Sequence, residues 1–282
     1  MLLNSMTWWC RERWGHTVRR GYREPREVQA WIGIGVALLV ILALDGPVSA
    51  YEETSIARPA SIVGVVKFSG TIPPPQRYKV TMGANPEYCR TLADAEGNIV
   101  TPQARVSAAQ ELADVVVFLQ EVEKGKPVPK AGPLVTVEQC RFGPRVVTGT
   151  IGQLLGVMMK DTIVHQIRGW EMVDKSRIPS FFSNGLNPGS EQSFPLHIKR
   201  SSILQLSCDQ HRFMEGWVLI TANPYATVTD DQGRFELTDI PPGTHTIGAW
   251  HPVLGYQEGT VTLTAGHQTT MTLTLTPSPA TK

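Results

Sequence analysis

The feature that most constrains the fold is a series of short runs rich in β-branched residues, each followed by glycine or proline. Helical periodicity is almost absent, and only residues 107–112 could form a turn or two of helix. Many short strands separated by such turns are typical of two packed β-sheets. The sequence therefore predicts an all-β sandwich. The expected strands lie within 61–70, 113–122, 133–140, 145–151, 153–161, 201–208 and 216–222.

The pattern changes after residue 222, where apolar and polar residues alternate with a period of two. Such alternation is typical of strands with one buried and one solvated face. We interpret TDDQGRF and IPPGTHT as turns, because Asp and Gly mark turns and no twelve-residue calcium loop is present. About sixty residues make a small core. No linker precedes them, so we expect this segment to pack against the preceding domain.

The first fifty residues have the order of a secretory leader. Positive charge at 19–29 precedes an uncharged apolar run at 31–44, and small residues precede a potential cut after Ala50. The apolar run is short for a bilayer span but suits a signal-peptide core, with an uncleaved N-terminal anchor as the alternative. We expect 1–50 to be removed, leaving a periplasmic or secreted protein that starts near Tyr51 and has no stable membrane insertion.

Charge and motifs exclude several classes of protein. The formal net charge is +1 and no run of like charges occurs, so nothing suggests a nucleic-acid partner. The sequence contains no H-E-x-x-H or G-x-S-x-G pattern, and no H-x-H pair that could bind the additional copper ions of a multicopper oxidase. We therefore expect a carrier or binding protein and not an enzyme.

The number of cysteines becomes odd once the leader is removed. Cys10 leaves with the leader, and three cysteines remain in an oxidising compartment, where two are expected to pair. We predict a Cys89–Cys140 disulfide that leaves Cys208 free for a metal. Parity alone also allows Cys89 and Cys140 to be two buried thiols.

The stretch CDQHRFM at 208–214 places a thiol, an imidazole and a thioether three residues apart. In a strand these side chains would alternate between faces, but the flanks are expected strands, so the stretch must form a tight loop that can direct all three to one point. A His₂Cys set with a weak axial Met is the blue-copper pattern. Phe213 and Trp217, beside the loop, are interpreted as core residues, with metal shielding or partner contact as the alternative.

A second histidine ligand has to come from elsewhere in the chain. His165 is the best candidate, because it follows an apolar run at an expected strand end. His197 lies within an expected strand, and His245 and His267 fall in the trailing segment. We interpret His251, in the trailing AWHP, as a packed and hydrogen-bonded histidine.

The patterns D-x-x-x-H at 161–165 and C-x-x-H-x-x-M at 208–214 resemble a cupredoxin of the plastocyanin and amicyanin type. The trailing VTDDQGRFELTDIPPGTHTIGAWHP resembles the carboxypeptidase regulatory-like, prealbumin-type module. Exported bacterial proteins that combine the two are labelled methylamine-utilisation or plastocyanin-like proteins. The resemblance implies a Greek-key cupredoxin sandwich over 51–222 and a small prealbumin-like β-module over 223–282. It is carried by roughly 135–222 and 216–275, whereas the motifs within 60–134 carry no chemistry of their own.

The resemblance also implies a function. It implies one type 1 copper ion held by His165, Cys208, His211 and Met214, in an exported one-electron carrier with an unidentified redox partner protein. Gln166 stands where cupredoxins usually have an Asn that supports the thiolate, so we expect Gln166 to act next to the ligands. The alternatives are a periplasmic copper storage or delivery protein, and a structural or binding β-sandwich without metal.

Overall fold

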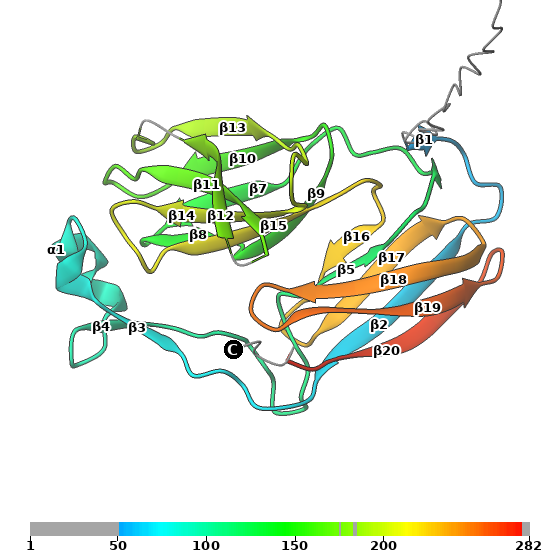
Figure 1. The fold of residues 1–282 in the computed structure, drawn as a ribbon, viewed down its shortest axis with the longest axis horizontal. Coiled ribbons are helices and arrows are strands. Elements are labelled where there is room, and N and C mark those ends of the chain that lie inside the picture. The colour runs from blue at the N-terminus through cyan, green and yellow to red at the C-terminus, as the bar shows by residue number, and fades with distance from the viewer. Residues whose placement is uncertain (1–50, 175, 183–184, 278–282) are drawn as a thin grey trace, which may run out of the picture. The chain divides into compact units, whose positions relative to one another are not determined.

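The computed structural model describes residues 51–174, 176–182 and 185–277, which are almost entirely β (Figure 1). The all-β prediction is confirmed. In these ranges no helix is long and apolar enough to cross a membrane. The predicted leader and Cys10 lie outside the described residues.

One sandwich is built from two sheets between residues 134 and 221 (Figure 1). Its strands are β7 Leu134–Glu138, β8 Arg141–Gly143, β9 Val146–Thr150, β10 Leu154–Met159, β11 Ile167–Val173, β12 Ser176–Phe182, β13 Glu191–Pro195, β14 Ile203–Cys208 and β15 Glu215–Thr221. The sheet orders are β13-β10-β7-β8 and β12-β11-β14-β15-β9. Pairing is antiparallel except for β10 with β7 and β15 with β9. We call this the first sandwich.

Period-two alternation explains how the first sandwich closes over its core. Val135 and Val137 on β7 are buried, and their neighbours on the strand are more exposed. They share one apolar cluster with Leu204 and Leu206 on β14 of the opposite sheet. Burial of each such side chain contributes roughly 1.5–3 kcal/mol. This cluster also contains Cys208, so the candidate ligand lies inside the core.

A second sandwich combines strands from both ends of the described chain. Its strands are β2 Ala60–Phe68, β5 Val116–Leu119, β16 Ala226–Val228, β17 Arg234–Ile240, β18 Gly243–His251, β19 Gly255–Leu263 and β20 Gln268–Leu275. The sheet orders are β16-β5-β18-β19 and β17-β2-β20. Tyr225, Ile62 and Leu119 are among the fully buried side chains of its core cluster.

The strand pairing differs from the predicted division into 51–222 and 223–282. β2 pairs in parallel with β20, with Ser61 opposite Gln268. β5 pairs with both β16 and β18. These two strands come from the predicted first domain, yet they occupy inner positions in the second sandwich. The physical reason is that the strands after residue 222 form too small a core and leave unpaired backbone edges, which β2 and β5 complete.

Residues 76–101 leave the sandwiches as an excursion that we call the cap. It contains β3 Gln76–Lys79, the 3-10 helices Val80–Met82 and Arg90–Leu92, α1 Pro86–Cys89, and β4 Asn98–Thr101, which pairs with β3. Proline at the first position of α1 supports the helix start, because its fixed φ suits a helix and its missing N–H is not needed there. The predicted helical turn at 107–112 is instead a turn followed by β-bridges. A two-stranded pair, β1 Glu52–Glu53 with β6 Lys124–Gly125, completes the strands.

Candidate metal centre

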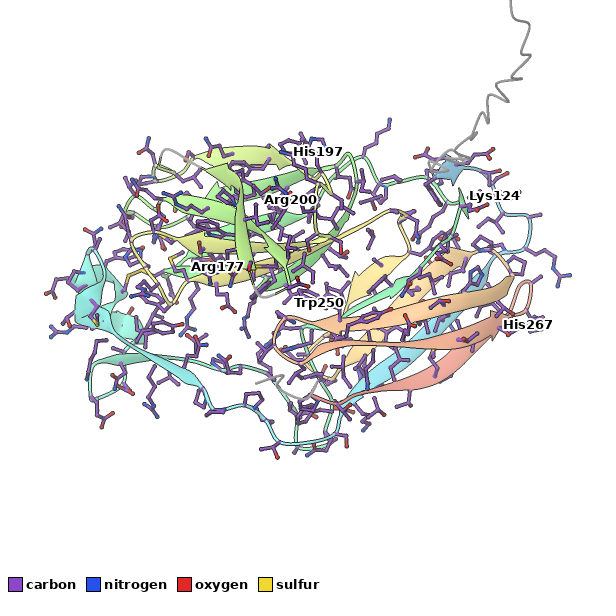
Figure 2. The ribbon with its side chains drawn as sticks, viewed as in Figure 1. Lys124, Arg177, His197, Arg200, Trp250 and His267 are labelled. Atoms are coloured by element: carbon purple, nitrogen blue, oxygen red, sulfur yellow. A yellow bond between two sulfur atoms is a disulfide. The ribbon has the colours of Figure 1, made fainter. Side chains whose placement is uncertain are left out.

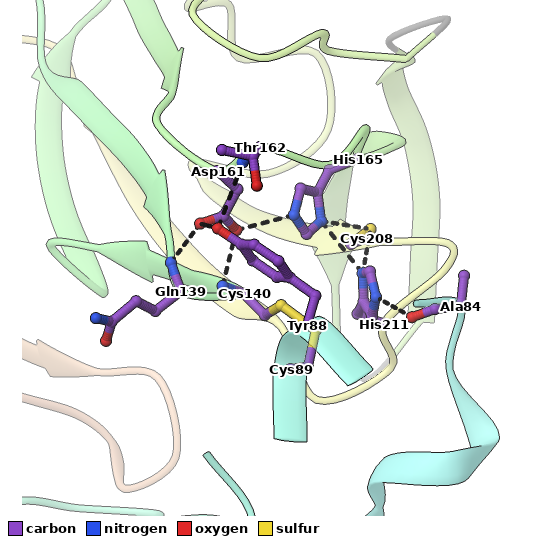
Figure 3. Close-up of a disulfide and its surroundings, with 10 residues drawn as sticks. All are labelled: Ala84, Tyr88, Cys89, Gln139, Cys140, Asp161, Thr162, His165, Cys208 and His211. Atoms are coloured by element: carbon purple, nitrogen blue, oxygen red, sulfur yellow. Dashed lines mark hydrogen bonds and ion pairs between the residues drawn. A yellow bond between two sulfur atoms is a disulfide. The ribbon is translucent and has the colours of Figure 1, made fainter. Parts of the chain in front are cut away.

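Three of the four predicted ligands meet at one buried point (Figure 3). The Nδ1 atoms of His165 and His211 are 3.2 Å apart, and each lies 3.6 Å from the Sγ atom of Cys208. Both histidines are wholly buried and Cys208 is 3% exposed. An ion bound about 2.0–2.3 Å from each donor fits between atoms at these separations. The donor set therefore fits one metal ion of the kind that accepts both imidazole and thiolate.

The strand pairing explains why these donors converge. Cys208 ends β14 directly opposite Ile167 on β11, so His165 lies just beyond the paired position. The chain then turns through 209–214 and returns as β15. Two backbone hydrogen bonds shape this loop, from the His211 N–H to the Cys208 carbonyl at 3.3 Å and from the Met214 N–H to the His211 carbonyl at 3.0 Å. The loop thereby directs His211 back over the end of β14.

His165 is held in orientation by Asp161. Its Nε2 lies 2.9 Å from the Asp161 Oδ2. The carboxylate is 1% exposed and accepts hydrogen bonds from the backbone N–H groups of Gln139 and Cys140 and from the Tyr88 hydroxyl. A buried carboxylate with this many donors has its hydrogen-bonding capacity satisfied and its position fixed. Asp161 therefore orients the imidazole, as carboxylates commonly do for metal-binding histidines.

His211 is held in orientation by the cap. Its Nε2 lies 2.7 Å from the backbone carbonyl oxygen of Ala84. The Ala84 N–H in turn donates to the Gln210 carbonyl at 3.2 Å, so cap and loop exchange two hydrogen bonds. A Cβ atom on Gly83 would lie 3.1 Å from the Gln210 carbonyl oxygen and 3.2 Å from the Cδ2 atom of the His211 ring, so a side chain at this position would crowd the ligand loop. The Cys89–Cys140 disulfide fastens the cap to the first sandwich.

These partners determine which nitrogen of each histidine carries the proton. The Asp161 carboxylate and the Ala84 carbonyl only accept hydrogen bonds, so Nε2 is the donor in both rings. In the neutral rings both Nδ1 atoms then present lone pairs to each other at 3.2 Å. Burial and the neighbouring His211 lower the pKa of His165, and burial lowers the pKa of His211. Both rings therefore resist protonation, and a proton is poorly suited to bridge the two Nδ1 atoms. A shared cation would relieve this repulsion.

A thiolate at Cys208 would need a positive charge beside it. Burial raises the pKa of its thiol, which disfavours the thiolate, and backbone N–H groups of Gln210, Gln166 and His211 oppose that shift. A bound metal supplies the positive charge that a buried thiolate requires. Gln166 acts on the Cys208 sulfur through its backbone N–H, and a role for its side chain stays a prediction.

Three residues beside the loop have different surroundings. Met214 is 2% exposed and belongs to the same core cluster as Cys208. The Phe213 ring lies 5.7 Å from the His211 ring. Trp217 belongs to another cluster, in an edge-to-face contact with Trp250 at 6.2 Å. Phe213 therefore borders the site, and Trp217 is a core residue away from it.

The remaining histidines lie elsewhere. His197 and His267 are exposed in loops, after β13 and before β20 respectively (Figure 2). The expectation that His197 lies within a strand is therefore wrong, because β13 ends at Pro195. His245 donates one hydrogen bond to the Pro241 carbonyl. His251 is wholly buried, and its Nδ1 accepts the backbone N–H groups of Val253 and Leu254. The structure thus places His251 in a packed and hydrogen-bonded environment.

Two further three-residue groups could be mistaken for metal sites. They are Cys89 with Cys140 and His211, and Cys140 with Asp161 and His165. Cys89 and Cys140 form a disulfide, so neither can offer a thiolate. The other members of these two groups are Asp161, His165 and His211, which belong to the His165–Cys208–His211 cluster or hold it in place.

Sequence reasoning missed the residues that hold the ligands in place. Asp161 was present in the D-x-x-x-H pattern without a role, and Tyr88 precedes a cysteine predicted to bridge to Cys140. Taken together, these two sequence features indicate that Asp161 and Tyr88 lie near the candidate metal centre. Ala84 acts through its backbone, so no side-chain pattern reveals it.

Comparisons with known proteins give limited information. No family model matches the chain, and no curated protein matches it. Among solved structures, a purple cupredoxin from Nitrosopumilus maritimus is 17% identical, with 32% of this chain and 99% of that chain covered and a TM-score of 0.27. A copper-containing nitrite reductase from Thermus scotoductus is 16% identical over 34% of this chain and 23% of its own, with a TM-score of 0.27. A reduced Cu(I) form of an amicyanin variant is 11% identical over 37% of this chain and 97% of its own, with a TM-score of 0.26. TM-scores this low carry no argument about function, which therefore rests on the geometry of the site.

Proposed function

We propose that the protein is a one-electron carrier with a type 1 copper site of the cupredoxin kind. The observation that carries this proposal is the buried triangle of two Nδ1 atoms and one Sγ atom, in which both Nε2 atoms are already engaged. Two imidazoles and one thiolate are the equatorial set of blue-copper centres. Bound copper would supply a single electron by cycling between Cu(I) and Cu(II).

The residues of this chain have separate roles in the proposal. His165, Cys208 and His211 would hold the ion, and Met214 would be the weak axial ligand that tunes the potential. Asp161 and the cap keep both rings fixed, so the ligands need little rearrangement when the charge of the ion changes. Burial excludes water from the ligands. If Met214 is the fourth donor, the ion would have no open position for a substrate, which would favour electron transfer over catalysis.

Burial also favours a carrier over the alternative of copper delivery. An ion that is to be handed over needs an exposed ligand, yet His165 and His211 are each fully buried and the cap covers His211. The Cys89–Cys140 disulfide supports the expectation of an exported protein, because disulfides persist in oxidising compartments.

The test is addition of Cu(II) to the metal-free protein, followed by optical and EPR spectroscopy. We expect one copper per chain and an intense thiolate-to-copper absorption band. Cys208→Ser should lose the band, because an alcohol is a poor substitute for a thiolate. Met214→Leu should keep the band and raise the potential, because donation from the axial sulfur to Cu(II) is lost.

Three results would contradict the proposal. One is copper binding without the band, and another is a band that persists in Cys208→Ser. The third is rapid loss of Cu(I) to a chelator such as bathocuproine, which would favour delivery.

A further inference from the structure

A basic groove opens beside the candidate metal centre. It has a volume of about 360 Å³ and is lined by the cap and the ligand loop, through Arg77, Tyr78, Lys79, Met82, Arg212 and Phe213. Three of these residues are cationic, and none of the described residues that line the groove is acidic. Such a surface attracts negative charge.

The cations of the groove are exposed and only partly neutralised. Arg77 pairs with Asp94 at 3.0 Å but keeps 59% of its side chain exposed. The Lys79 ammonium donates to the Glu96 carbonyl, which carries no net charge. Arg212 is exposed and forms no ion pair with any described residue. Beyond the lining residues, Tyr78 lies within electrostatic reach of the acidic Glu215 and of the exposed Arg177 on β12, so the cations around the groove outnumber but do not exclude acidic groups.

Aromatic rings connect this groove with a candidate ligand. The Phe213 ring lies 5.7 Å from the His211 ring, and the Tyr78 ring lies 6.4 Å from Phe213. Phe213 and Tyr78 both line the groove, whereas His211 is wholly buried beneath the cap. A partner therefore has no direct access to the His211 ring. It can touch the half-buried Tyr78, and Phe213, which is only 8% exposed, lies between Tyr78 and His211.

We propose that this groove is the docking site for an acidic surface of a redox partner protein, with Phe213 and Tyr78 between the partner and His211. The inference rests on the proposed function. With copper bound, the step would oxidise Cu(I) to Cu(II) and give that one electron to the partner, with no proton or atom transferred. Complementary charge chiefly accelerates encounter and fixes orientation, so its effect belongs in a rate.

The experiment uses the reduced, copper-loaded full chain and two inorganic oxidants of opposite charge. Hexacyanoferrate(III) is anionic and tris(1,10-phenanthroline)cobalt(III) is cationic, and each takes one electron. The variants are Arg212→Gln alone and Arg77→Gln with Arg212→Gln. The matched control is Lys124→Gln, which removes an exposed cation of β6 outside the groove (Figure 2). An unchanged absorption band shows that each variant keeps its site.

We expect the rate with hexacyanoferrate(III) to fall about threefold to fivefold for each groove charge removed at low ionic strength, and less in high salt. The rate with the cobalt complex should not fall, and Lys124→Gln should change neither rate. Poly-L-glutamate, a probe for an acidic protein surface, should inhibit the hexacyanoferrate reaction of the wild type and lose this effect in the double variant.

The results that would overturn the proposal are distinct. If the groove substitutions change both oxidation rates equally, or change neither, the groove is not a docking site. The proposed function as an electron carrier would still stand. Charge-dependent rates without inhibition by poly-L-glutamate would mean that the groove accepts small anions only. Reduced protein that gives no electron to either oxidant would overturn the proposed function itself.

Discussion

Each sandwich buries histidine completely, but the two environments differ. In the first sandwich, His165 and His211 direct Nδ1 toward each other and toward the Cys208 sulfur, and both Nε2 atoms are engaged. In the second, the His251 Nδ1 accepts two local backbone N–H groups, and its Nε2 has no hydrogen-bond partner among the described residues. Burial is therefore a poor criterion for a metal ligand. Convergence of lone pairs from separate elements is the better one.

The comparison can be broken directly by removing one histidine from each sandwich. We expect His165→Ala to abolish the thiolate-to-copper band, because one of three converging donors is lost. We expect His251→Asn to keep the band, because Asn places an acceptor near the position of Nδ1 for the N–H groups of Val253 and Leu254. Copper titration followed by optical spectroscopy measures both. A band lost in His251→Asn but kept in His165→Ala would mean that the second sandwich contributes to the site.

The next largest effect concerns the disulfide, which ties the cap to the first sandwich only. Replacing Cys89 and Cys140 together by Ala should lower the free energy of unfolding by about 4 kcal/mol in the chain-entropy model, given a sequence separation of 51. Urea denaturation of the metal-free protein measures the loss. Hydrogen exchange should then show weaker protection in β10 and β14 and little change in β18 and β19. Equal weakening of both sandwiches would contradict a local role for the cap.

The smallest expected effect is the loss of stability in acid that His251 causes in the second sandwich. Burial, and then the charge of Arg145, lower the pKa of His251 to about 4 from its ordinary 6.5. The unfolded chain therefore binds this proton more readily, so stability is greatest above pH 6.5 and falls as pH drops toward 4. His251→Asn should remove about 2 kcal/mol of the stability lost by the wild type between pH 7.5 and pH 5. Denaturant titrations at both pH values measure this difference. An equal loss of unfolding free energy in the wild type and in His251→Asn would show that His251 is already paired or exposed.

Much of the local structure was predictable from the sequence. Each of the seven expected strands before residue 222 overlaps an observed one, because β-branched runs between Gly and Pro carry a strong local signal. The loop at 208–214 was also predictable, since two strands close to each other in sequence leave little choice of path. His165 could be chosen because it follows the apolar run of β10, although it lies past the end of that strand at Met159 and shortly before β11 begins at Ile167.

Contacts between distant segments were not predictable in the same way. Nothing in the sequence near β2 specifies that it pairs with β20, because both are alternating strands that fit several neighbours. The cap acts through the Ala84 carbonyl, and backbone atoms have no residue-specific signal. Asp161 can hold His165 only because the backbone N–H groups of Gln139 and Cys140, from a different turn, donate to its carboxylate.

The pairing of β2 with β20 also has a consequence for the order of folding. Ser61 and Gln268 are about two hundred residues apart in the chain, so the sheet that contains β2 cannot be completed until β20 has been synthesised. The donors His165, Cys208 and His211 all precede that last strand. During synthesis the first sandwich can therefore assemble while β2 still lacks its final neighbour. A chain cut short before β20 would keep the three donors and expose an unpaired strand edge, which is a template for aggregation.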